Sequence, residues 1–155
     1  MKVTIIFFVT ILLFTCSLFS QENSDEKAII DLIHQSYQAL LDRDIDKYLD
    51  TWAHEETAAR ISITGTEFYE TIGWDSLKAM YVNGFKNNPD PDDAKFEYKN
   101  FKIKIKDDMA WASCDKFNKN EAGEMEKDTV REFRRLVKKD GKWKILSMFF
   151  IHFME

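Results

Sequence analysis

The order of hydrophobic and polar positions divides the chain into a helical first part and a strand-rich second part. In residues 24–42, apolar side chains recur at the spacing of one helix face, at Ile29, Ile33, Tyr37 and Leu40. The break "DRD" follows, and residues 45–54 predict a second, short helix. Residues 74–85 predict a third helix whose candidates for the buried face are Leu77, Met80, Tyr81 and Phe85.

Strand patterns flank the third helix. Ile61 and Ile63 alternate with polar residues, which predicts a strand, and "TEFYETIG" reads as an extended connection. After the loop "NNPDPDD", four more strands are expected over residues 95–105, 109–117, 128–137 and 142–153, with a bulge near Asn100. This order favours an α+β fold. We expect a cone in which three N-terminal helices pack on a curved, mainly antiparallel sheet and enclose a pocket.

The first twenty residues have the pattern of a secretory signal peptide. Lys2 precedes an apolar run from Val3 to Phe14, and small or polar residues follow at Ser17 and Ser20. We therefore expect an exported protein, periplasmic or secreted, whose single domain spans residues 21–155 and has no membrane span after cleavage. Lipid attachment at Cys16 is the disfavoured alternative, because bulky residues precede that cysteine.

Composition removes several classes of function. The formal net charge of −5 at pH 7 argues against general nucleic-acid binding, which depends on neutralising phosphates. Cys114 is alone once the signal is removed, so no internal disulfide is expected. The three histidines, His34, His54 and His152, lack the spacing of metal ligands, and no phosphate-binding loop is present. No metal or cofactor is expected.

Three stretches carry a resemblance to a known superfamily: "YQALLDRDIDKYLDTWAHEE", "ISITGTEFYETIGWDSLKAMY" and the closing "KDGKWKILSMFF". In this order they resemble the nuclear transport factor 2-like superfamily, which includes SnoaL-like domains and ketosteroid isomerases. The resemblance implies the cone fold and a homodimer formed through the sheet. It does not imply one activity, because the superfamily includes isomerases, cyclases, dehydratases, and binding or assembly domains.

The functional residues of ketosteroid isomerases do not carry over. Aligned on Asp44-Ile45-Asp46, the isomerase tyrosine falls on Ser36, its base on Arg60 and its protonated aspartate within residues 131–135. An arginine is permanently protonated and cannot act as the base. We therefore do not expect ketosteroid isomerase activity. The same alignment places five residues in the pocket: Trp52, Tyr81, Met148, Phe150 and His152.

Arg60 is the sixth predicted pocket residue and the most informative one. An arginine in a mainly apolar pocket needs a carboxylate partner, which Glu67 or an acidic ligand could supply. Alternatively, the arginines of the chain lie on the outer sheet face, paired with Glu132 and other acids. In "REFRR" arginines occupy both strand parities, so at least one of them points away from the pocket.

Three functional hypotheses follow. The leading one is an exported domain that binds a small, partly apolar ligand, with an acidic ligand as one option, and that has no recognisable catalytic set. The second is a lyase, isomerase or cyclase in which His152 or Glu67 is the general base, although His152 also fits a strand end with its tip in water. The third is a homodimeric assembly domain, with apolar candidates for the sheet interface at Phe96, Tyr98, Trp111 and Phe133.

Overall fold

The computed structural model describes residues 24–153, except the side chains of residues 127–129 and 153. The predicted signal peptide, residues 1–20, and the alternative lipid site at Cys16 lie outside the described residues and stay predictions. Within the described range, no helix is both long and apolar enough to cross a membrane.

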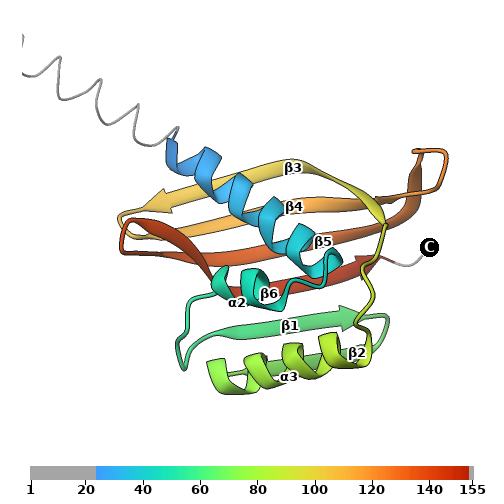
Figure 1. Cartoon of the computed structure of the whole chain (residues 1–155). Coiled ribbons are helices and arrows are strands. Elements are labelled where there is room, and N and C mark those ends of the chain that lie inside the picture. The colour runs from blue at the N-terminus through green and yellow to red at the C-terminus, as the bar shows by residue number, and fades with distance from the viewer. Residues whose placement is uncertain (1–23, 154–155) are drawn as a thin grey trace, which may run out of the picture.

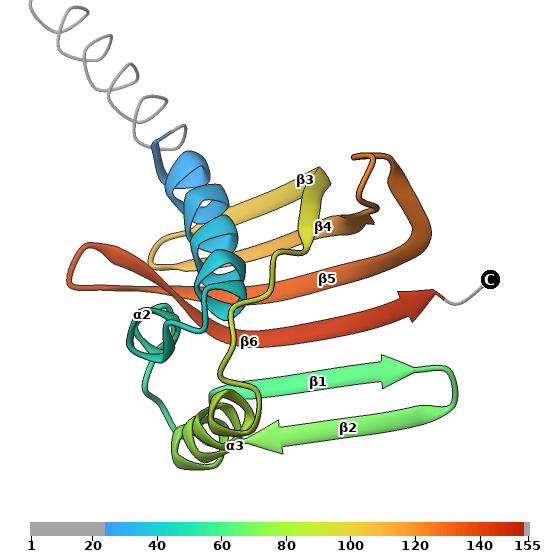
Figure 2. The ribbon, with the colours of Figure 1, turned by 45° about the vertical axis from the view of Figure 1, so that its right-hand side comes forward.

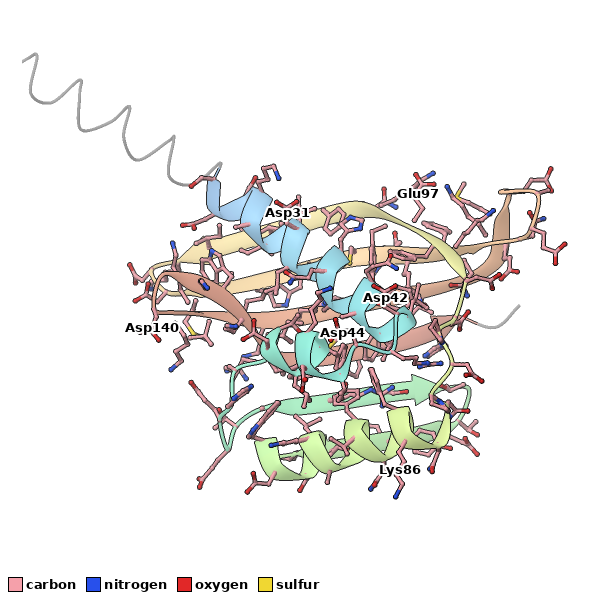
Figure 3. All side chains as sticks on the ribbon, in the orientation of Figure 1. Asp31, Asp42, Asp44, Lys86, Glu97 and Asp140 are labelled. Atoms are coloured by element: carbon pink, nitrogen blue, oxygen red, sulfur yellow. The ribbon has the colours of Figure 1, made fainter. Side chains whose placement is uncertain are left out.

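Three helices form one layer of the molecule (Figure 1). An N-terminal helix covers residues 24–41, followed by α2 (Ile45–Asp50) and α3 (Trp74–Asn87). Asp44 caps α2 by accepting a hydrogen bond from the backbone amide of Lys47 at 3.0 Å; Figure 3 labels Asp42 and Asp44 at this break. α2 ends earlier than predicted, because Trp52 already pairs with Ile145 in a parallel β-bridge.

Six strands form the second layer: β1 (Ala59–Thr64), β2 (Glu67–Ile72), β3 (Lys95–Lys106), β4 (Met109–Lys119), β5 (Met125–Lys139) and β6 (Lys142–Phe153). Their order in the sheet is β2-β1-β6-β5-β4-β3, and only β1 and β6 are parallel. The α+β prediction is confirmed, with a curved mixed sheet that does not close. The segment predicted as an extended connection is in fact β2, because it pairs with β1 along its whole length.

All three helices lie against the same face of this sheet, as the two ribbon views show (Figures 1 and 2). α3 contacts β1 and β2, and it also contacts α2. We call the helix-covered face the inner face and the opposite one the outer face. None of the described helices covers the outer face.

The predicted bulge near Asn100 is confirmed. The register of β3 against β4 shifts between Lys99 and Lys102, and Asn100 has a φ of 56°. The shift lets Tyr98 and Phe101 face the same side, where both rings contact His34 of the N-terminal helix. A second shift, between Arg135 and Leu136, changes the parity of β6 upstream of Ser147.

Of the four apolar candidates for a dimer interface on the outer face of the sheet, two lie on the inner face. Phe96 and Tyr98 were wrong candidates, because both rings contact Tyr37 of the N-terminal helix and therefore lie on the inner face. Trp111 and Phe133 do lie on the outer face. There Phe133 contacts Trp111 on β4 and Phe149 on β6, with ring centroids about 6 Å apart.

Candidate functional site

A cavity of about 500 Å³ lies between the helices and the inner face of the sheet. Five of the six predicted pocket residues line it: Arg60, Tyr81, Met148, Phe150 and His152. The sixth, Trp52, was misplaced. It is 1% exposed and packs behind the cavity wall against Tyr48 and Tyr81, because the bridge to Ile145 draws it into the core.

Strand register arranges the cavity floor in rows of inward-facing side chains. One row joins Arg60 on β1, Met148 on β6 and Arg134 on β5. The next row joins Phe150 and Glu132, and a third joins His152, Val130 and Lys116. Since successive inward residues of a strand are about 7 Å apart, charged groups from four strands face one small space.

Arg134 and Glu132 form a buried cluster with Tyr98 and Ser36. Each of the two charged residues is 1% exposed, and Arg134 donates from Nη2 to Glu132 Oε2 at 2.5 Å. Arg134 also donates to Ser36 Oγ at 2.8 Å and to the Tyr98 hydroxyl, which donates in turn to the other oxygen of Glu132. Burial alone would lower the pKa of Arg134, but the Glu132 carboxylate raises it above its ordinary value. The cluster is charge-compensated.

Arg60 lacks such compensation. Among the described residues no carboxylate oxygen lies within 4.0 Å of its guanidinium. Its charged group instead lies over the Phe150 ring, 5.2 Å from the ring centroid. The prediction that Glu67 pairs with Arg60 is wrong. Glu67 is exposed next to the turn of the β1–β2 hairpin, where the hydroxyl of Tyr69 donates to it. For the same reason Glu67 cannot serve as a base inside the cavity.

Lys116 is a second cation without a carboxylate partner in the described part of the chain. Its Nζ donates to the hydroxyl of Tyr37 at 2.9 Å and lies 4.2 Å from the centroid of that ring. Tyr37 thus holds the ammonium group at the cavity wall without neutralising it. Lys116 and Tyr37 were not predicted as pocket residues.

His152 shares this charged environment. Its pKa is lowered, first by partial burial and then by the positive charges of Lys116 and Arg60, while Glu132 acts in the opposite direction. The imidazole is therefore neutral at pH 7 and has one unprotonated ring nitrogen that can accept a hydrogen bond.

Two phenols form the helix side of the cavity. Tyr48 and Tyr81 pack with their ring centroids 4.6 Å apart, and burial raises the pKa of both hydroxyls. The Tyr81 hydroxyl is fully buried, and the hydroxyl of Tyr48 is the polar group that interacts with it most closely. These two phenols therefore contribute ring surface to the cavity wall.

The described residues do not form a metal site or an activated cysteine nucleophile. No group of three potential metal-ligating side chains gathers in the described part of the chain. Burial raises the pKa of the Cys114 thiol to about 12, so it is not an activated nucleophile. His54 stacks on Trp74 outside the cavity, with its Nε2 3.1 Å from the carbonyl oxygen of Leu49 at the end of α2.

The fold has many relatives among solved structures. An NTF-2 like protein of unknown function from Shewanella oneidensis is 23% identical, with a TM-score of 0.59 over 82% of this chain and 98% of that one. A protein of unknown function with a cystatin-like fold from Nostoc punctiforme is 18% identical, with a TM-score of 0.63 over 83% and 91%.

An NTF2-like protein from Streptomyces avermitilis, provisionally named a dehydratase, is 13% identical, with a TM-score of 0.65 over 86% of this chain and 99% of that one. These likenesses concern the fold. No curated protein matches the chain at a significant level. The sequence profile of the SnoaL-like domain matches residues 29–150, and the chain therefore belongs to the SnoaL-like domain family.

Proposed function

We propose that this domain binds a small, partly apolar organic anion in the cavity between its helices and its sheet. The observation that carries the proposal is that Arg60 and Lys116 face the cavity without a carboxylate partner in the described part of the chain. Arg43, a third cation of the lining, donates to backbone carbonyls. An acidic ligand would supply the missing charge.

The charge distribution supports this proposal. The chain as a whole has a net charge of −5. In contrast, the described lining carries four arginine or lysine side chains and one carboxylate, Glu132, which Arg134 already compensates. The remaining lining is mostly aromatic and sulfur-containing, including Tyr81, Phe150 and Met148. Such a lining favours a ligand with an apolar body and an acidic group.

Benzoate and its neutral isostere benzamide test the requirement for charge. We expect benzoate to raise the Tm of the purified protein and benzamide to leave it unchanged, because only the anion compensates Arg60. Arg60→Gln should weaken benzoate binding at least thirtyfold, about 2 kcal/mol, when measured by isothermal titration calorimetry.

Arg135→Gln is the matched control. Arg135 is exposed on the outer face of the sheet, where its strand partner is Ser147 on β6. Its loss should therefore leave benzoate affinity unchanged. The proposal is wrong if benzoate and benzamide bind alike, or if Arg60→Gln and Arg135→Gln have equal effects.

The outer face supports a second proposal, that two copies of the chain pair through their sheets. Trp111 is 40% exposed and contacts Phe133, which in turn contacts Phe149. Ile61 on β1 is the strand partner of Phe149 and continues this apolar row. We expect a dimer by light scattering, and Phe149→Glu should make it a monomer while Phe149→Leu should not. A wild-type monomer at high concentration would exclude this assembly.

A lyase, isomerase or cyclase remains the alternative activity. Of the two bases considered from the sequence, His152 faces the cavity and Glu67 does not. A neutral imidazole beside two cations could remove a proton from a bound anion. This alternative predicts turnover that disappears in His152→Gln while benzoate binding and folding are retained.

A further inference from the structure

The hydrogen-bonding groups of the cavity specify more than the charge of its ligand. On the sheet floor of the cavity, the groups free to engage a ligand are mainly donors: the guanidinium of Arg60 and the remaining ammonium hydrogens of Lys116. These groups suit an acceptor such as a carboxylate.

Acceptors on the same floor are fewer. The two oxygens of Glu132 are occupied by Arg134 and by the Tyr98 hydroxyl. The Tyr37 hydroxyl accepts from Lys116, and Ser36 Oγ accepts from Arg134. His152 differs, because no described residue forms a hydrogen bond with its ring and its neutral form has an unprotonated nitrogen.

The distance between Arg60, a donor, and His152, an acceptor, suggests the size of the ligand. The guanidinium of Arg60 lies over the ring of Phe150. His152 is the next inward-facing residue on β6, roughly 7 Å along the strand from Phe150. A ligand anchored by its acid on Arg60 therefore has His152 within reach of a second polar group on the far side of a six-membered ring.

We propose that the cavity takes an aromatic hydroxy acid, whose carboxylate binds Arg60 and whose own hydroxyl donates a hydrogen bond to His152. This inference rests on the proposed function, since it names the class of anion. The aromatic side chains that line the cavity, including Tyr48, Phe85 and Phe150, suit a flat ring between the two polar ends.

The pair 4-hydroxybenzoate and benzoate tests the inference, because the two anions differ only in the hydroxyl group. Titration calorimetry on the wild-type protein should give about fivefold to tenfold tighter binding of 4-hydroxybenzoate, the gain expected from one additional hydrogen bond. In His152→Leu this ratio of affinities should fall to about one. In His152→Gln, which keeps an acceptor, part of the preference should remain.

His54→Leu is the control histidine variant, since His54 stacks on Trp74 outside the cavity, and it should keep the wild-type ratio. A wild-type ratio of one, with benzoate bound and sensitive to Arg60→Gln, would overturn the hydroxy-acid inference and leave the anion proposal standing. A preference that survives in His152→Leu would overturn the role of His152. Failure of both anions to bind would overturn the inference together with the proposed function.

Discussion

Two arginines of the cavity floor, Arg134 and Arg60, lie in the same row of the sheet but in opposite electrostatic situations. Arg134 is 1% exposed and has a carboxylate, a phenol and a serine hydroxyl as partners. Arg60 is half-buried and has an aromatic ring beneath it, but no carboxylate in the described part of the chain. One strand, β6, separates their two strands.

Under the proposed function, this difference separates a structural charge, Arg134, from a ligand-binding one, Arg60. The sequence supplies Glu132 two residues before Arg134, on the same face of the same strand, so that pair is complete before any ligand binds. Arg60 has no such partner in the described part of the chain, and in our proposal the anionic ligand supplies it. The ion pair and the unpaired cation therefore respond differently to mutation.

The largest effect is expected from Glu132→Gln. This change leaves Arg134 as a buried cation without its counter-charge and should lower the free energy of unfolding by about 3 kcal/mol or more. The midpoint and slope of urea denaturation measure this loss.

Glu97→Gln provides the control, because Glu97 pairs with Lys119 at 3.0 Å in an exposed position on β3 (Figure 3). Its loss should cost far less than the loss of Glu132, because solvent screens an accessible ion pair. The double variant Glu132→Leu with Arg134→Met should recover most of the stability, since it removes both charges. If Glu132→Gln costs no more than Glu97→Gln, the buried pair is not structural.

A smaller effect on stability is expected when Arg60, rather than the buried pair, is changed. Arg60→Met should change the unfolding free energy by less than about 1 kcal/mol, because it removes no ion pair and retains contact with Phe150. Arg134→Met should destabilise the protein by about 3 kcal/mol, because it leaves Glu132 buried and unpaired. Parallel urea titrations compare the two variants, and equal losses would mean that Arg60 is structural too.

Much of the fold could be predicted from local patterns. The helical spacing of residues 24–42 and the parity change at Asn100 are properties of neighbouring residues, and both have the predicted counterpart in the structure. β2 was missed because "TEFYETIG" has no clear alternation, and its pairing with β1 depends on a partner strand rather than on its own composition.

The site was harder to predict, because its chemistry depends on which charges meet across strands. Parity showed that the arginines of "REFRR" divide between two faces, but not that Arg134 is the inward one. One of the two alternatives placed Glu132 on the outer face together with the arginines. Its spacing of two residues from Arg134 predicts only that both side chains share one face. Contact between Lys116 and Tyr37, 79 positions apart in the chain, has no local signal.

The smallest effect concerns pH, and one part of it depends on the same uncompensated charge. The lowered pKa of His152 means that below its ordinary value of 6.5 the unfolded chain binds more protons than the folded protein. The contribution of His152 to stability is therefore complete above pH 6.5 and is lost as the pH falls through the folded-state pKa. Partial burial is the largest cause of this lowered pKa, and the facing groups that add to it are Lys116 on β4, Arg60 on β1 and, with opposite sign, Glu132 on β5.

Urea midpoints at pH 7.5 and pH 5.5 measure the effect as a difference between wild type and His152→Gln, which cancels the titration of the carboxylates. We expect the wild type to lose more stability than the variant on acidification, and Arg60→Gln to reduce that loss because one of the two repelling charges is gone. The control His54→Gln should behave as the wild type. Equal pH dependence in wild type and His152→Gln would show that neither burial nor the facing cations Lys116 and Arg60 lower the pKa of His152.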